Sequence, residues 1–141
     1  MKILLLNGAN MNMLGKRNRE LYGADTLAAL ERKVVAFGTQ LGATVVCKQS
    51  NCEGELIDIL QQTDANAVVF NAGAYSHYSI ALRDCIECLE IPVAEVHMTD
   101  IYAREDFRHV DVLKAVCQGY FVGKGVASYL DAVEFLVKLC D

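Results

Sequence analysis

Hydrophobic residues along this chain gather in short runs that alternate with stretches of helical periodicity. The runs are four to seven residues long and rich in Val, Ile, Leu or Phe, which is typical of buried parallel strands. They predict strands over 2–6, 43–49, 67–71, 92–97 and 119–122. Because no internal repeat or low-complexity segment interrupts this alternation, residues 1–141 are expected to form a single domain.

Helical patterns fill the intervals between these runs. Each has a capping residue at its expected start, and Gly42 would end the first helix. The expected helices are 27–41 after Thr26, 53–62 after Ser50 or Asn51, 76–89 from Ser76, and 126–139 after Gly125. Strands and helices in strict alternation predict an α/β fold, a flavodoxin-like doubly wound sheet of five parallel strands.

Composition and charge narrow the classes of function. The chain has 141 residues, of which 53% are hydrophobic, and a net charge of -5. It is therefore long enough to bury a core, and it has no overall basic character that would favour nucleic acid. The apolar run after Met1 and Lys2 is too short for a signal peptide, and no stretch approaches a membrane span. We expect a cytoplasmic protein that binds neither nucleic acid nor membranes.

The six cysteines sit mostly among apolar neighbours and are expected to be reduced core residues. Cys85 and Cys88 form a C-x-x-C sequence, but no second pair or histidine stands at the spacing of zinc ligands. The motif also falls inside an expected helix, whereas a redox motif of this kind opens a helix after a strand. The sequence predicts no metal site and no cofactor.

A polar, glycine-punctuated loop, NGANMNMLGKRNRELYG at 7–23, follows the first strand and holds the main candidate residues. Open α/β sheets bind ligands at the carboxyl ends of their strands, where this loop would place Asn10, Arg17 and Tyr22. A phenol is a useful base only where a cation stabilises its phenolate, so Tyr22 with Arg17 suggests proton abstraction. The glycines fit a mobile active-site lid over about 12–24.

Polar residues follow the other strands as well, and four chain segments would converge on one cleft. The residues expected there, in addition to those of the first loop, are Gln49, Ser50, Asn51, Asn71, Tyr75, Ser76, His77, Glu95, His97 and Thr99. His77 and His97 fall after strands, where an imidazole can shuttle protons near neutral pH. For Ser50 and Asn51, helix capping and turn formation is the alternative interpretation.

Five ordered segments make the chain resemble the type II 3-dehydroquinate dehydratases over almost its whole length. They are NGANMNMLGKRNRELYG, QSNCEGELID, NAGAYSHYSIALRD, EVHMTDIYAREDFRH and GKGVASYLDAV. The resemblance implies dehydration of 3-dehydroquinate to 3-dehydroshikimate, a step of the shikimate pathway toward aromatic amino acids, through an enolate and without metal or cofactor. It also implies trimers that assemble into a dodecamer. Whether the pathway role is biosynthetic or catabolic stays open.

The resemblance implies a role for each matching residue. Tyr22 would take the proton from C2 of the substrate, and Arg17 would stabilise the phenolate and the enolate. His97 would protonate the departing C1 hydroxyl, Glu95 would orient His97, and Asn10 would hold a water at the enolate oxygen. The implied substrate-binding residues are Asn71, His77, Arg108, Met98 and Thr99 through their backbone, and Asp84 from a neighbouring subunit.

The chain departs from the family pattern at several positions near this site. Asn18 and Arg19 replace the usual Glu-Pro, and Asp111 stands where serine is usual. Arg19 would add a second cation near Tyr22, and Asp111 would compete electrostatically for Arg108. The other departures are Ala9 and Ala72 in place of proline and Asp100 in place of asparagine.

Two other protein classes share this order of elements. A flavin or nucleotide binder could use the Gly-Lys-Gly sequence at 123–125, but the full glycine fingerprint is absent and the glycines more simply cap the last helix. A receiver-type signalling module needs clustered aspartates after the first and third strands. Asn7 and Asn71 stand there instead, which disfavours that class.

Overall fold

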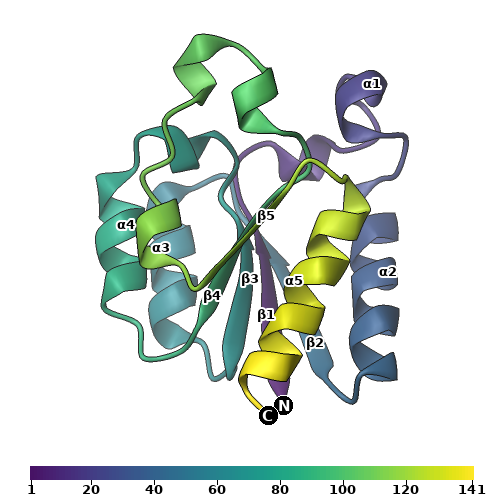
Figure 1. Ribbon diagram of the computed structural model, residues 1–141, viewed down its shortest axis with the longest axis vertical. Helices are drawn as coiled ribbons and strands as arrows, with labels where there is room; N and C mark the ends of the chain where they lie inside the picture. The colour runs from purple at the N-terminus through teal and green to yellow at the C-terminus, as the bar shows by residue number, and fades with distance from the viewer.

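Five parallel strands form the central sheet, in the order β2-β1-β3-β4-β5, in the computed structural model, which describes all 141 residues (Figure 1). The strands are β1 Lys2–Asn7, β2 Thr44–Gln49, β3 Ala67–Asn71, β4 Val93–His97 and β5 Gly119–Val122. This order is that of a flavodoxin-like doubly wound sheet, so the predicted fold class is confirmed. The strand bounds agree with the expected ones to within one residue.

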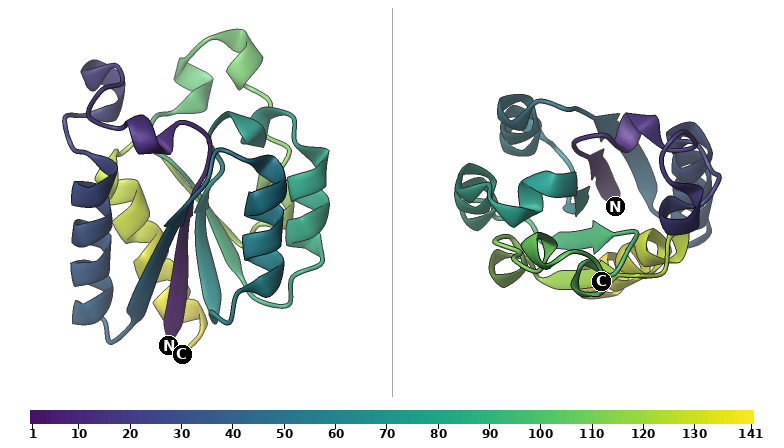
Figure 2. Two further views of the ribbon diagram at one scale, coloured as in Figure 1. Left: turned by 180° about the vertical axis from the view of Figure 1, so that it is seen from behind. Right: turned by 90° about the horizontal axis from the view of Figure 1, so that it is seen from above.

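Helices cover both faces of this sheet (Figures 1 and 2). The helices α2 (Leu27–Gln40) and α5 (Val126–Leu139) pack on one face, and α3 (Glu53–Gln62) and α4 (Ile80–Glu87) pack on the other. The expected cap of α2 is confirmed, because the Thr26 hydroxyl accepts the Ala29 N–H at 3.2 Å. The sheet is therefore buried from both sides, as a parallel sheet requires.

Alternate residues of β1 contribute to two separate apolar cores. Ile3 and Leu5 belong to the core under α2 and α5, whereas Leu4 and Leu6 belong to the core under α3 and α4. All four side chains are at most 2% exposed, and burial of each leucine or isoleucine stabilises the fold by about 1.5–3 kcal/mol. β1 is thus fixed from both faces, which in turn fixes where the loop after it begins.

The segment after β3 differs from the prediction of one helix from Ser76 to Leu89. Gly73–His77 forms a 3-10 helix that ends at Tyr78. The helix α4 begins only after Ser79, whose hydroxyl accepts the Leu82 N–H at 3.0 Å. Ser76 is fully buried and its hydroxyl donates to the Gly73 carbonyl. Ser76 therefore stabilises the preceding turn, and Ser79 is the true N-cap.

Short helical turns stand above the carboxyl edge of the sheet (Figure 1). One is α1 (Arg19–Tyr22), which lies within the segment expected as a lid, and the others are the 3-10 helices Ile101–Ala103 and Asp106–Arg108. Two further 3-10 helices are Met11–Met13 and Lys114–Val116. Both termini lie at the opposite end of the molecule (Figures 1 and 2).

None of the helices combines the length and the apolar character needed to cross a membrane.

Candidate functional site

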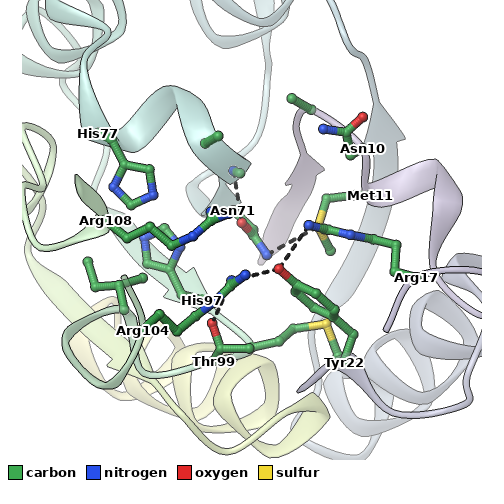
Figure 3. Close-up of a pocket in the computed structure, with 15 residues that line it drawn as sticks. Asn10, Met11, Arg17, Tyr22, Asn71, His77, His97, Thr99, Arg104 and Arg108 are labelled. Carbon is green, nitrogen blue, oxygen red and sulfur yellow. Dashed lines mark hydrogen bonds between the residues drawn. The ribbon is translucent and has the colours of Figure 1, made fainter. Parts of the chain in front are cut away.

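A pocket lies at the carboxyl ends of β1, β3 and β4 (Figure 3). After β1 the chain continues to one face of the sheet and after β3 to the other, which leaves a crevice between the two strand ends. Doubly wound folds bind their ligands in this crevice. The lining residues are Ala9, Asn10, Met11, Arg17, Tyr22, Asn71, Gly73, Ala74, His77, His97, Met98, Thr99, Ile101, Arg104 and Arg108. Three arginines and two histidines are among them and no acidic residue is, so the pocket suits an anionic ligand.

The hydroxyl of Tyr22 lies between two guanidinium groups (Figure 3). Arg17 Nη2 donates to this oxygen at 2.8 Å and Arg104 Nη1 donates at 2.7 Å. The Arg17 guanidinium carbon also lies 3.8 Å from the centroid of the Tyr22 ring. The predicted pairing of Tyr22 with Arg17 is therefore present, and two charge-assisted donors on one phenolic oxygen stabilise a phenolate.

Arg104 lines the pocket and contacts Tyr22, although the sequence pattern did not indicate it. The expected second cation, Arg19, is exposed on α1 and makes no hydrogen bond to the Tyr22 hydroxyl, whereas Arg104 does. Arg104 stands in the irregular segment after β4, and its Nη1 also donates to Thr99 Oγ1 at 3.4 Å. The only signal for it in the sequence was a cation within the segment 95–109, which could not reveal contact with a tyrosine 82 positions earlier.

His97 ends β4 and forms a buried cluster with two carboxyl groups. Its Nε2 lies 2.6 Å from Glu95 Oε2 and 3.7 Å from Asp111 Oδ2. Residues 95 and 97 share one face of the strand, because alternate side chains of a strand point the same way. The side chains of His97, Glu95 and Asp111 are 7%, 0% and 1% exposed, so the cluster is closed to solvent on the side away from the pocket.

The environment shifts the proton affinities of this cluster. Burial raises the pKa of Glu95 to about 8, against the opposing effect of its hydrogen bond to His97. Burial alone would lower the pKa of His97, but the neighbouring carboxyl groups of Asp111 and Glu95 outweigh it and raise that pKa to about 9. His97 is thus held in its protonated form at neutral pH, as a proton donor must be.

The position of Asp111 corrects the prediction that it competes for Arg108. Asp111 points at His97 and Glu95, whereas Arg108 Nε donates to Glu105 Oε2 at 2.9 Å. Atoms of Glu95, His97 and Asp111 lie within 4.8 Å of one another, which would allow them to ligate a metal ion. However, ligand atoms on one metal are about 3 Å or more apart, given bonds of about 2.0–2.2 Å. The 2.6 Å separation of His97 and Glu95 is instead that of a hydrogen bond, so this geometry fits a proton and not a metal ion.

Asn71 lines the pocket and is also part of a buried hydrogen-bond chain. Its Nδ2 donates to the Tyr129 hydroxyl at 2.8 Å, and that hydroxyl donates to Asn7 Oδ1 at 2.6 Å. Tyr129 comes from α5, and the sequence analysis did not single it out because it reads as a core position of an amphipathic helix. The chain of bonds fixes the ends of β1 and β3 relative to each other.

The other predicted residues divide into those that line the pocket and those that lie elsewhere. His77, Met98, Thr99 and Arg108 line it, and Asn10 lies at its rim without making any of the interactions drawn in Figure 3. Seven predicted residues lie outside the pocket. Glu95 lies behind His97, and Asp84 is exposed on α4. The other five serve the local structure: Gln49 and Asn51 form hydrogen bonds with the loop after β1, Ser50 and Ser76 form local turns, and Tyr75 donates to the Asn51 carbonyl.

Residues 1–137 match the family described as "Dehydroquinase class II". The chain is 48% identical over 141 residues to the 3-dehydroquinate dehydratase of Pelotomaculum thermopropionicum, covering 99% of this chain and 98% of that protein. It is 46% identical over 144 residues to that of Leptothrix cholodnii, covering 100% and 97%. The solved type II dehydroquinase of Propionibacterium acnes superposes with a TM-score of 0.94 at 37% identity, covering 97% of this chain and 96% of that one.

Proposed function

Since the chain belongs to the class II dehydroquinase family, it is a 3-dehydroquinate dehydratase, and we propose that it acts through an enolate, with Tyr22 as base and His97 as acid. The observation that supports these roles is the Tyr22 hydroxyl held by two guanidinium groups, in a pocket that protonated His97 also lines. The proposed base and the proposed acid thus line the same cavity.

The first step is removal of the proton on C2, next to the C3 ketone. The phenolate of Tyr22, stabilised by Arg17 and Arg104, takes this proton, and the electrons of the C–H bond move to the ketone oxygen as an enolate. Donors aimed at that oxygen lower the barrier most, because the charge develops there. A water held by Asn10 at the pocket rim is the proposed donor, with Arg17 as the nearest cation.

The second step expels the C1 hydroxyl. The enolate oxygen re-forms the C3 ketone, the electrons of the C2=C3 bond form the C1=C2 double bond, and the C1–O bond breaks as His97 gives its proton to the departing oxygen, which leaves as water. Nε2 of His97 is engaged by Glu95, so Nδ1 is the ring nitrogen that remains for the substrate. Tyr22 is then protonated and His97 neutral, and one proton passing between them through water restores both groups for the next turnover.

Positive charge accounts for substrate binding. The carboxylate of 3-dehydroquinate would pair with Arg108 and with backbone N–H groups at Met98 and Thr99, as carboxylates favour such donors. Arg104 Nε is buried without a partner, which leaves one more donor near the anion. Asn71 and His77 are placed to bind the substrate hydroxyls.

A homo-oligomer, with trimers that assemble into a dodecamer, is part of the proposal. Asp84 is exposed on α4 and lies outside the pocket of its own chain, so it would reach a substrate only in a neighbouring copy. Tyr78, just before this helix, and Ile80, its first residue, are 63% and 55% exposed, which fits an apolar contact surface. A cytoplasmic location is also proposed, supported by six free cysteines.

The activity and the base are tested together. The purified chain should convert 3-dehydroquinate to a product with the ultraviolet absorbance of a conjugated enone. Tyr22→Phe should abolish turnover and leave binding of substrate nearly unchanged in calorimetry, because only the base is lost. Tyr102→Phe, at an exposed tyrosine outside the pocket, is the matched control and should keep full activity. Tyr22→Phe activity within about tenfold of the unmodified chain would remove Tyr22 from this role.

The absence of metal and imine chemistry is tested separately. No lysine lines the pocket, so borohydride added with substrate should not inactivate the enzyme. Activity should also persist after treatment with chelator. Inactivation by either reagent, with substrate protection or metal rescue to prove specificity, would contradict the enolate mechanism.

A further inference from the structure

Two carboxyl groups meet at the closed end of the site, behind His97. One oxygen of each, Glu95 Oε1 and Asp111 Oδ2, is buried and has no N–H or hydroxyl partner. Buried polar atoms in folded proteins nearly always have a hydrogen-bond partner, so two neighbouring carboxyl oxygens without one need a physical explanation. The two carboxyl groups are neighbours, with oxygen atoms within 4.8 Å of each other.

Two carboxylates cannot form a hydrogen bond with each other, because both are acceptors only. They also cannot both stay ionised side by side where water is excluded. A single proton between them satisfies the free oxygen of each group. We propose that Asp111 is a positioning residue that shares one proton with Glu95, so that Glu95 meets His97 as a neutral carboxylic acid at neutral pH.

The surroundings place that proton on Glu95. Asp111 Oδ1 accepts the backbone N–H groups of Leu113 at 2.9 Å and Lys114 at 3.2 Å, both of which stabilise its charged form. Glu95 has no such donors and its side chain is 0% exposed. Burial acts to raise the pKa of both carboxyls, but the proximity of His97 and Glu95 and the hydrogen bond from the Leu113 N–H lower that of Asp111, whereas that of Glu95 stays raised.

No other group facing the cluster supplies the missing donor or a compensating charge. Burial raises the pKa of Tyr120 and of Cys117, so both are neutral, and the Lys114 amine lies over the Tyr120 ring, 4.4 Å from its centroid. The titratable and charged groups that surround the pair are His97 on β4, Cys117 before β5, Tyr120 on β5, Lys114 on its 3-10 helix, and Asp100 and Tyr102 beyond Tyr120. Of these groups only His97 forms an ion pair with the carboxyls, and the Tyr120 hydroxyl is buried without a hydrogen-bond partner of its own.

The consequence concerns the strength of His97 as an acid, and this step rests on the proposed function. With Glu95 neutral, the nearest full negative charge lies on Asp111, 3.7 Å from Nε2, instead of on the Glu95 oxygen at 2.6 Å. Attraction between charges weakens with distance, so the imidazolium releases its proton more readily than it would beside an ionised Glu95. Asp111 therefore keeps His97 oriented by Glu95 without making it too weak an acid.

The proposal is tested on the resting enzyme by infrared spectroscopy, which detects a protonated carboxylic acid through its carbonyl stretching band. The full-length enzyme should show this band at pH 7 and lose it as pH rises through about 8, the pKa of Glu95. Asp111→Asn and Glu95→Gln should each abolish the band at pH 7. The matched control is Asp58→Asn, at an exposed position on α3, which should retain it.

Each outcome decides the question without reference to turnover. A protein without the band at pH 7, or a band that persists in Asp111→Asn or in Glu95→Gln, would overturn the shared proton. If Asp111→Asn does not fold, the Glu95→Gln spectrum decides alone. If the unmodified chain does not turn over 3-dehydroquinate, the proposed function is contradicted while the infrared result still stands. Failure of the proposed function and failure of the shared proton are therefore distinguishable.

Discussion

At the scale of single residues, the site depends on contacts between side chains that are far apart in the sequence. Arg17 and Arg104 reach the same Tyr22 oxygen from different elements, α1 with its preceding loop and the segment after β4. Each guanidinium is charged at any working pH and directs one N–H group at this oxygen, at 2.8 Å and 2.7 Å. The second arginine therefore adds a directed donor to the base.

Arg104→Ala should lower kcat by about 100-fold or more, because one of two donors that stabilise the phenolate is lost. Arg19→Ala is the matched control and should change kcat by less than about twofold, since Arg19 is exposed, does not line the pocket and makes no hydrogen bond to the Tyr22 hydroxyl. Steady-state kinetics with 3-dehydroquinate would measure both. Equal losses in the two variants would show that general positive charge, and not the Arg104 contact, assists the base.

At the scale of elements, the turns after β1 and β3 cross closely at the floor of the pocket. A Cβ on Gly8 would lie 2.5 Å from the Ala72 carbonyl oxygen, and one on Gly73 would lie 2.6 Å from the Ala9 carbonyl oxygen. Gly73 also has φ of +65°, in the left-handed region that other residues adopt at a cost. Glycine at both positions allows the two backbones to approach.

Gly73→Ala should lower the free energy of unfolding by about 1–3 kcal/mol, because the added methyl group meets a backbone oxygen and the φ value is strained. Gly54→Ala is the opposite case, since a Cβ there meets nothing and the residue lies within α3. That variant should be more stable by about 0.5–1 kcal/mol. Urea unfolding monitored by circular dichroism would measure both, and an unchanged Gly73→Ala would show that the turn relaxes freely.

At the scale of the whole molecule, the buried cluster links stability to pH. The folded state raises the pKa of Glu95 from 4.5 to about 8 and that of His97 from 6.5 to about 9. At a pH between the ordinary and the raised pKa of each group, the folded chain holds a proton that the unfolded chain has released. This contribution to stability is therefore full below the ordinary pKa values and is lost as pH rises toward 8 and 9.

The free energy of unfolding should accordingly fall between pH 6.5 and 8, with a slope of about 1.4 kcal/mol per pH unit for each proton. Glu95→Gln should reduce this slope, because only His97 then contributes, and Asp58→Asn should leave it unchanged. Denaturant unfolding at several pH values would supply the slope. Stability that rises with pH over this range would contradict the raised pKa values.

Assembly is the second property of the whole molecule. If Asp84 completes a neighbouring site, Asp84→Ala should raise KM for 3-dehydroquinate and loosen the oligomer. If Asp84 is only a surface charge, its loss should lower the free energy of unfolding by about 0–1 kcal/mol and leave the kinetics of the enzyme unchanged. Light scattering and activity should be measured on the same samples, with Glu87→Ala on the same helix as control. A fully active monomer would defeat the shared site.

The sequence by itself determined the order of the elements and most of the site. Runs of apolar residues predicted all five strands, and Thr26 and Gly125 correctly marked the starts of α2 and α5. These features are local, since periodicity and capping depend on residues a few positions apart. The carboxyl ends of parallel strands share one edge, so the meeting of Tyr22, His77 and His97 followed from the fold class.

Only the tertiary structure decided which charged side chains lie next to Tyr22 and His97. Arg104 is the second residue that donates to the Tyr22 hydroxyl, and Asp111 faces His97 while Arg108 binds Glu105. Arg104 and Asp111 come from the irregular segment between β4 and β5, where no periodicity indicates which way a side chain points. Hydrogen bonds and charges act over a few ångströms, so contacts between side chains depend on the folded path of that segment and are not encoded in a local pattern.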